Sequence, residues 1–399
     1  MKRPTPRRLY WYMARCLRLQ QYLESPGDGR QSPQVPARCL VWALLIGRLL
    51  REHSYHAVEA LVRSPARRAL GVGRRFGDDA LGYFTERLDP ALTRAALLTA
   101  IRQAKRNKAF DNSRWIGLAV DGTTVGRRSS TSPTCSLCRP RTDQAKKVHC
   151  YLHHFAMISV VGTGLSLPFD VEPYGSGDSE YSATLRLLRR AVVHLGMRFA
   201  DYVVADGEFA RAPFLHAAGD LGLNVVVRLK ANLPELLAAA QKRFAGQPPD
   251  LVFSHYADRI EIWDADDLDP WETLRWKTVR VLRYRQHKPN GNIIEALWLT
   301  DFPKRLLGSR SLFHIAKSRW EIENQGFNDA KNRYGLEHIC HHQPRSLLID
   351  WLLTLLAITI ERLYRLRYLH RGTHPVRTAI ELLRLLRLSL SRPMAFDSS

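Results

Sequence analysis

Two short apolar runs, each ending in Asp-Gly, place the tightest constraint on how this chain can fold. The first is WIGLAVDGTTV, from Trp115, and the second is ADYVVADGEFA, from Ala200. Short apolar runs that end in a glycine turn predict buried strands, and the amphipathic segment 181–196 between them predicts a helix. A further strand is predicted over 223–230. Strands that alternate with helices indicate an α/β core with parallel strands.

Each of these two strands is predicted to end in a carboxylate, Asp121 in the first and Asp206 in the second. Ligands of open α/β sheets gather beyond the carboxyl ends of the strands. Two carboxylates on adjacent strands can hold hard divalent cations through oxygen. Asp-Gly is also a common turn signal, so neither aspartate identifies a metal site by itself.

A third acidic residue lies in a charged segment, 309–333, that predicts an amphipathic helix. Four of its residues follow at intervals of four and so share one helix face: Arg319, Glu323, Phe327 and Lys331. A carboxylate flanked by cations suits a metal site beside a phosphate. Glu321 is rotated away from Glu323 by roughly 200°. The same spacing also fits a plain Arg–Glu pair on a solvated helix.

These motifs together resemble the DDE transposases of bacterial insertion sequences. The resemblance is carried by DGT from Asp121, VADGEF around Asp206, and RWEIENQGFNDAKNRYGLEH around Glu323. It implies an α/β fold: a ribonuclease-H-like catalytic core with a β-rich insertion and a helical N-terminal region. It also implies that the three carboxylates hold Mg²⁺ or Mn²⁺, as two ions roughly 3.5–4 Å apart. The implied function is metal-dependent cleavage of insertion-sequence ends and 3′-OH strand transfer into target DNA.

The resemblance also implies residues that contact DNA, and the sequence departs from the family pattern at two of its positions. Arg319 and Glu323 match, but Ala316 stands where the family usually has Tyr, and Lys331 comes one residue later than the commonest spacing. The expected DNA-binding residues are Arg319, Lys331, Lys230 and Trp298. Trp298 would stack on a flipped base, although a Trp in an alternating strand is more often part of the core.

The net charge is consistent with a DNA partner. The chain has 60 Lys and Arg against 38 Asp and Glu, a formal charge of +22, which points to a polyanion. The apolar stretch 347–360 contains Asp350 and falls short of the roughly 20 residues needed to cross a membrane. The N-terminus shows no signal peptide, and six cysteines form no disulfide framework. We therefore expect a cytoplasmic, nucleoid-associated bacterial protein without a membrane partner, acting as a homodimer or higher oligomer on DNA.

Two groups of cysteines and histidines are candidate zinc sites. Cys135 and Cys138 form CxxC, which is followed by histidines and a cysteine between 149 and 154. We expect Cys135, Cys138, His149 and His153 to be the ligands if zinc binds. A loop with two free cysteines is the alternative. A second, less regular group is His338, Cys340, His341 and His342.

The chain divides into four regions that differ in composition and predicted secondary structure. Residues 1–110 read as helical and are a candidate DNA-end-binding region, with a solvated helical cap as the alternative. Residues 111–244 and 301–371 would form the catalytic core, with a buried apolar helix over 345–369. Residues 245–300 read as a β-rich insertion with a hairpin turn at 289–292. Residues 372–399 would be a basic C-terminal tail.

Other carboxylates and other functions compete with this interpretation. Asp170, Glu172 and Glu180 lie between the two strand aspartates, and structural or supporting roles are expected for them. One alternative function is a ribonuclease-H-like nuclease that cuts DNA without joining strands. The other is a catalytically inert, basic DNA-binding protein.

Overall fold

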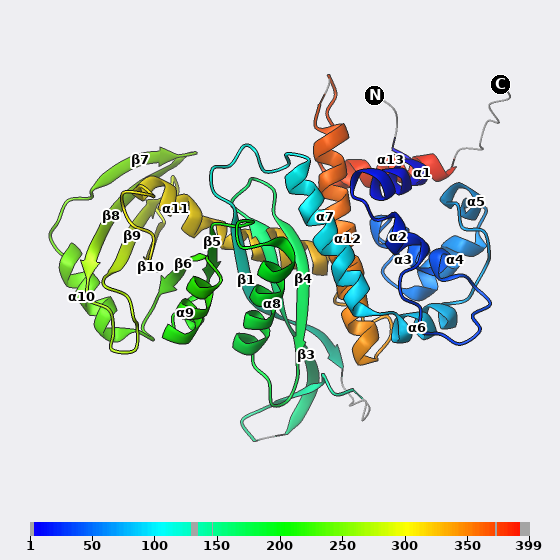
Figure 1. Cartoon of the computed structure of the whole chain (residues 1–399), viewed down its shortest axis with the longest axis horizontal. Coiled ribbons are helices and arrows are strands. Elements are labelled where there is room, and N and C mark those ends of the chain that lie inside the picture. Colours follow the sequence, from blue (N-terminus) through cyan, green and yellow to red (C-terminus); the bar gives the residue numbers. More distant parts are fainter. Residues whose placement is uncertain (1–3, 129–134, 146, 372, 392–399) are drawn as a thin grey trace.

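The computed structural model describes residues 4–128, 135–145, 147–371 and 373–391, without the side chains of 127, 128 and 149. A mixed ten-stranded sheet runs through it in the order β2-β3-β1-β5-β6-β10-β9-β8-β7, with β4 paired to β3 (Figure 1). The strands are β1 (Gly117–Arg128), β2 (Arg139–Thr142), β3 (Val148–Val161), β4 (Leu167–Tyr174), β5 (Tyr202–Ala205), β6 (Asn224–Leu229), β7 (Leu251–His255), β8 (Asp258–Leu268), β9 (Val279–His287) and β10 (Ile293–Thr300).

The middle of the sheet is a ribonuclease-H-like core with strand order β4-β3-β1-β5-β6. Strands β1, β5 and β6 are parallel, whereas β3 is antiparallel to both β1 and β4. The expectation of parallel strands is therefore right for three strands and wrong for β3 and β4. The physical reason is the short link between β3 and β4, because a parallel pair needs a crossover of a dozen residues or more.

Strands β7 to β10 extend the same sheet. Strand β10 pairs antiparallel with β6, and β9, β8 and β7 follow in order. The hairpin turn predicted at 289–292 is present: the N–H of Lys288 donates to the carbonyl of Asn292 at 2.9 Å, and Gly291 has φ +82°. Because only glycine adopts this φ without strain, the turn can close tightly there.

Helices cover both faces of the sheet. Helices α8 (Glu180–Leu195) and α9 (Ala212–Asp220) lie in front of it in Figure 1, and α11 (Ser309–Ser318) passes behind. Helix α10 (Pro234–Phe244) packs against β8. Each helix buries an apolar stripe against the strands, as amphipathic helices do.

Helix α12 (Pro344–Tyr364) stands between the sheet and most of the N-terminal helices (Figure 1). It is buried over nearly its whole length, as the apolar sequence predicts. Its two acidic residues are paired: Arg48 contacts Asp350 at 3.0 Å and Arg51 contacts Glu361 at 2.9 Å. Removing one partner of a buried pair leaves an uncompensated charge, so these bonds tie α12 firmly to the N-terminal helices.

Seven α-helices precede the sheet in the described chain. They are α1 (Pro6–Trp11), α2 (Gln20–Glu24), α3 (Ala37–Leu49), α4 (Tyr55–Arg63), α5 (Ala66–Leu70), α6 (Asp78–Arg87) and α7 (Pro90–Arg106). Helix α7 begins at a capped end, because the side chain of Asp89 accepts from the N–H of Ala91 at 2.8 Å. Helices α3, α6 and α7 all contact α12.

The C-terminal region is partly helical. Where the sequence predicts a basic tail, residues Ala379–Ser391 form α13, which packs against α5. Arg387 donates to the carbonyl of Leu50 at 2.9 Å. Helix packing against an apolar face outweighs the local excess of arginine here. Among the described residues, no helix has the length and apolar character needed to span a bilayer.

Candidate active site

The two strand aspartates lie opposite each other. In the parallel pairing of β1 with β5, Gly117 faces Tyr202 and Ala119 faces Val204. The same register, continued by two residues, sets Asp121 beside Asp206. Strand β5 stops at Ala205, whereas β1 continues past Asp121 to Arg128. The predicted strand end is therefore correct for Asp206 only, because β3 goes on pairing with β1.

Glu323 joins the same cluster through Arg319. The guanidinium of Arg319 contacts Asp121 Oδ2 at 3.1 Å through Nη1 and Glu323 Oε1 at 2.6 Å through Nη2. Arg319 is buried, with 8% of its side chain exposed, whereas Glu323 is 39% exposed. One cation thus joins two of the three acidic side chains.

The segment that carries Glu323 is not the continuous α-helix that its sequence predicts. After α11 the chain forms two π-helical turns, η3 (Ile322–Phe327) and η4 (Asp329–Arg333). Hydrogen bonds in such turns close one residue later than in an α-helix, and π turns are frequent at functional sites. The spacing of four still brings Arg319 to Glu323, because the π turns begin only after Arg319.

Asp206 is held by a second cation. Lys230, the residue after β6, contacts Asp206 Oδ2 through its ammonium at 2.7 Å. Burial raises the pKa of Asp206, but the hydrogen bond from Lys230 and the nearby charge of Arg319 outweigh it, so this pKa lies below its usual range. Asp206 therefore stays ionised at neutral pH.

The pKa of Asp121 is shifted in the opposite direction to that of Asp206. Burial raises the pKa of Asp121 to about 6, against the pull of Arg319 and with help from the negative charges of Glu180 and Glu323. A crowded cluster of carboxylates raises the pKa of its members in this way. A divalent cation would relieve this crowding.

Glu180, at the start of α8, is a fourth carboxylate beside this cluster. Tyr174 donates its hydroxyl to Glu180 Oε2 at 3.3 Å. The Glu180 carboxylate lies so close to Gly122 that any Cβ there would overlap with it. Gly122 is therefore needed for this close approach, a signal that the motif DGT alone does not reveal. Burial raises the pKa of Glu180, and the charge of Asp206 adds to it.

The other two rival carboxylates serve a structural network. Asp170 contacts Arg94 at 3.0 Å and Arg190 at 2.6 Å, and Glu172 contacts the same two arginines at 3.0 and 2.7 Å. These bonds join β4 to α7 and α8. Asp170 and Glu172 are thus engaged away from the carboxylate cluster, as expected.

Glu321 points away from Glu323, as the helix geometry predicts. Its carboxylate accepts a hydrogen bond from the N–H of Gly162 at 3.2 Å. Burial raises the pKa of Glu321 to about 7. Glu321 is therefore a half-buried group that supports the backbone of the β3–β4 link.

Two of the expected DNA-binding residues, Lys331 and Trp298, contact other parts of the protein in this structure. Lys331 donates to the carbonyl of Thr124 on β1 at 2.9 Å and is half-buried. Trp298 lies in β10 with none of its surface exposed. The expectation that Trp298 stacks on a base is wrong in this structure, because its ring is packed against Trp320 in the core.

The cluster has the donor set of a divalent-cation site. Asp121, Asp206 and Glu323 offer oxygen atoms alone, which suits Mg²⁺ or Mn²⁺ better than softer metals. In the described part of the chain, no group makes a hydrogen bond of ordinary geometry to the buried Oδ1 of Asp206. A buried polar atom needs a partner, and a bound cation would supply one.

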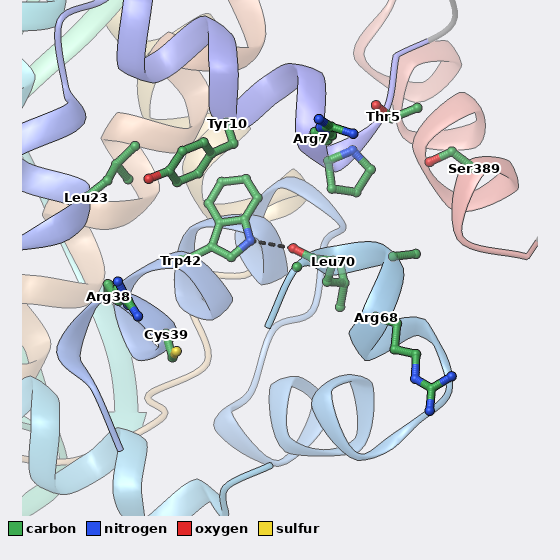
Figure 2. Close-up of a pocket in the computed structure, with 13 residues that line it drawn as sticks. Thr5, Arg7, Tyr10, Leu23, Arg38, Cys39, Trp42, Arg68, Leu70 and Ser389 are labelled. Carbon is green, nitrogen blue, oxygen red and sulfur yellow. Dashed lines mark hydrogen bonds between the residues drawn. The ribbon is translucent and has the colours of Figure 1, made fainter. Parts of the chain in front are cut away.

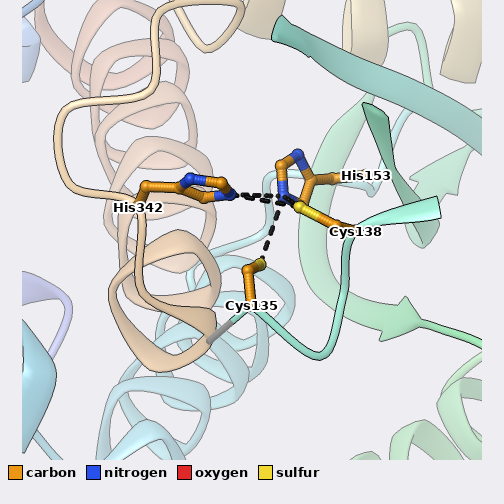
Figure 3. A group of neighbouring side chains, drawn as sticks. All are labelled: Cys135, Cys138, His153 and His342. Atoms are coloured by element: carbon orange, nitrogen blue, oxygen red, sulfur yellow. Dashed lines mark hydrogen bonds between the residues drawn. The ribbon is translucent and has the colours of Figure 1, made fainter. Parts of the chain in front are cut away.

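The predicted zinc residues lie away from the carboxylate cluster, and the group that the structure brings together differs from the predicted set in one member. Cys135, Cys138 and His153 come together with His342, and their ligand atoms all lie within 4.8 Å of one another (Figure 3). The side chain of His149 is outside the described residues. The second candidate group is therefore wrong as a set: His341 pairs with Glu86 at 2.6 Å and Cys340 contacts Arg48 at 3.4 Å.

A pocket of about 530 Å³ lies among the N-terminal helices. Three arginines line it, Arg7, Arg38 and Arg68 (Figure 2). Its wall includes Trp42, whose ring nitrogen donates to the carbonyl of Leu70 at 2.6 Å. The pocket thus combines positive charge with aromatic surface, well away from the carboxylate cluster.

Comparisons with known proteins bear on residues 115–360. This range matches the family model described as "Transposase DDE domain". Among curated proteins, no sequence matches. The cryo-EM structure of the piggyBac transposase synaptic complex with hairpin DNA is similar with TM-score 0.49 and 11% identity, over 98% of this chain and 82% of that chain. A likeness this weak carries no argument about fold or function.

Proposed function

The chain belongs to the transposase DDE family, and from this premise we propose that it cleaves insertion-sequence ends and transfers the freed 3′-OH to target DNA. The observation that carries the proposal is the bridge made by Arg319 between Asp121 and Glu323, next to Asp206. Three acidic groups from separate segments meet there at the end of a parallel strand pair, where ligands of such sheets bind.

Asp121, Asp206 and Glu323 are the proposed ligands of Mg²⁺ or Mn²⁺. When bound, such ions make a nucleophile of water or of a 3′-hydroxyl near neutral pH and stabilise the leaving oxygen. Glu180 lies close enough to stabilise the same cations by charge.

Arg319 and Lys230 have two roles in this proposal. In the metal-free protein they neutralise the carboxylates, through contacts of 2.6 to 3.1 Å. With cations on the carboxylates, both side chains can turn to the phosphates of DNA. The planar guanidinium of Arg319 suits two phosphate oxygens, and the ammonium of Lys230 suits one.

The proposed DNA-end-binding region is the set of N-terminal helices. Residues 1–110 contain 21 Lys and Arg against eight Asp and Glu, more than half of the net charge of +22. Phosphate contacts position a protein on DNA, and base contacts select the site. The arginine-lined pocket between α1, α3 and α5 is the part of this region where charge and aromatic surface meet.

We propose that two or more copies act together. Each chain carries one set of the three carboxylates, and a mobile element has two ends. A pair of chains, each engaged with one end, would place both ends beside the target.

A strand-transfer assay tests the proposed function. The protein is incubated with Mg²⁺ and a plasmid that carries the DNA flanking its own gene. We expect nicks at the element ends and covalent joining of those ends to a second plasmid. Nicking without joining would favour the nuclease, and DNA binding without either reaction would favour the inert binding protein.

A further inference from the structure

We propose that Cys135, Cys138, His153 and His342 form a structural zinc site that fastens the segment before α12 to the catalytic sheet. The site is independent of the proposed transposition reaction, because it shares no ligand with the carboxylate cluster. Its fourth ligand, His342, lies 189 positions after His153 in the chain, so no local motif contains it. Figure 3 shows the four side chains pointing toward one centre.

Two of the ligands are brought together by strand pairing. The N–H of Cys138 donates to the carbonyl of Cys135 at 3.2 Å, so the CxxC segment closes into a tight turn. Arg139, the residue after Cys138, lies on β2 and pairs with Leu152 on β3. Because the strands are antiparallel, the same register continued by one residue sets Cys138 beside His153. The backbone pairing therefore brings the thiols to the imidazole.

Hydrogen bonding alone cannot account for the close contacts around His153. Its Nε2 lies 3.4 Å from Cys135 Sγ, 3.3 Å from Cys138 Sγ and 3.1 Å from His342 Nε2. A neutral ring nitrogen has either one proton or one lone pair, so it can satisfy one of these three neighbours. A metal ion at the centre satisfies all four ligand atoms at once.

The spacing and the atom types fit zinc. Tetrahedral zinc, with bonds of about 2.3 Å to sulfur and about 2.0–2.1 Å to nitrogen, sets its ligand atoms about 3.3–3.8 Å apart. The four separations between neighbouring ligand atoms, from 3.1 to 3.4 Å, are close to this range. His153 is fully buried and Cys135 is 7% exposed. Four protein ligands that leave no open position are typical of structural zinc.

The position of His342 gives the site its effect on the fold. His342 comes two residues before the start of α12. Its neighbour His341 pairs with Glu86 on α6 at 2.6 Å. The segment is thus held to the N-terminal helices on one side and, through the proposed zinc, to β2 and β3 on the other. Binding would set where α12 begins relative to the sheet that carries Asp121.

Metal analysis of the purified full-length chain tests the proposal directly. We expect about one zinc per chain that survives dialysis. Replacing it with Co²⁺ should give the visible d–d bands of a tetrahedral site and the near-ultraviolet band of thiolate bound to Co²⁺. A chain prepared with added zinc that holds none after dialysis would overturn the proposal, as would a Co²⁺ spectrum without the thiolate band.

Matched variants identify the ligands. Cys138→Ser and His342→Gln should lose the zinc on dialysis, whereas Cys150→Ser and His341→Gln should keep it. If His342→Gln retained zinc and His149→Gln lost it, the assignment of the fourth ligand would be wrong. Asp121→Asn should keep the zinc whether or not it cleaves DNA, so a failure of the transposase proposal can be told apart from a failure of this one.

Discussion

The carboxylate cluster and the cysteine–histidine cluster differ in the partners that their side chains have in the metal-free protein. At the first, three acidic side chains already have cationic partners, Arg319 and Lys230. At the second, two thiols and two imidazoles surround one centre and contact one another. The first has oxygen donors and a partly exposed Glu323, and the second has sulfur and nitrogen donors around a buried His153.

If both clusters bind metal as proposed, this difference would make the first an exchangeable metal site and the second a permanent one. Hard cations on exposed carboxylates bind and leave readily, because water and phosphate can replace the ligands. A closed set of thiolates and imidazoles holds zinc as part of the folded structure. We therefore expect metal at the carboxylates to control the reaction, and metal at the cysteine–histidine cluster to control stability.

The largest expected effect is the loss of DNA cleavage in Asp121→Asn, Asp206→Asn or Glu323→Gln. Each change removes one charged oxygen ligand, and groups that act as a unit lose most of their activity when one is removed. We expect a fall in cleavage of about 10³-fold or more. DNA affinity should stay near the wild-type value, because it depends on cations elsewhere. Gel assays of nicking and binding on the same variants measure both.

Glu321→Gln is the matched control for these variants. It makes the same chemical change two residues from Glu323, in a carboxylate that binds Gly162 instead. The amide oxygen can still accept that hydrogen bond, so cleavage should remain close to the wild-type rate. An inactive Glu321→Gln beside an active Glu323→Gln would show that the wrong acidic residue has been assigned.

Zinc removal should affect stability and leave the carboxylate site chemically intact. We expect Cys138→Ser to lower the melting temperature by about 5 °C or more, since the binding energy of zinc is part of the folding energy. Scanning calorimetry with and without added Zn²⁺ measures this. Added Mg²⁺ should not restore the melting temperature. A variant as stable as Cys150→Ser would contradict a structural role for the cluster.

Most of the DNA affinity is expected to come from cations outside the two proposed metal sites. Arg7, Arg38 and Arg68 line the pocket in the N-terminal helices. A triple change to Gln should reduce the slope of log affinity against log salt by up to about 2.7, or about 0.9 for each phosphate that is no longer neutralised. Truncation is a poorer test, because α12 packs against these helices.

The matched control is a triple change to Gln of exposed cations at the far end of the sheet, Lys242, Arg243 and Arg259. Filter binding at several salt concentrations compares the two variants. An equal change in slope for both variants would show that the phosphate contacts are not concentrated in the N-terminal helices.

The smallest expected effect concerns the balance of charge in the carboxylate cluster. Arg319→Gln removes the cation between Asp121 and Glu323, so metal no longer competes with it. At pH 8, above the pKa of about 6 for Asp121, we expect Mn²⁺ to bind about tenfold more tightly. Calorimetric titration without DNA measures this change. Unchanged or weaker Mn²⁺ binding would show that Arg319 does not compete with the metal.

Local sequence alone was enough to predict several parts of this molecule. The apolar runs before Asp121 and Asp206 predicted β1 and β5, because strand formation depends on short-range patterning. Helix geometry separated Glu323 from Glu321, which bind different partners. Composition indicates a polyanion as partner, because net charge depends on no contact, and that partner stays a prediction.

Only the tertiary structure decided which distant residues meet. His342 joins His153 across 189 positions, and Lys230 reaches Asp206 because β5 and β6 are neighbours in the sheet. The burial of Trp298 follows from the pairing of β10 with β6, which the sequence of the insertion does not encode locally. Such contacts depend on the packing of whole elements, whose free energy is shared over many residues. A short motif therefore identifies a candidate residue, and the packing of the whole fold determines which residues it contacts.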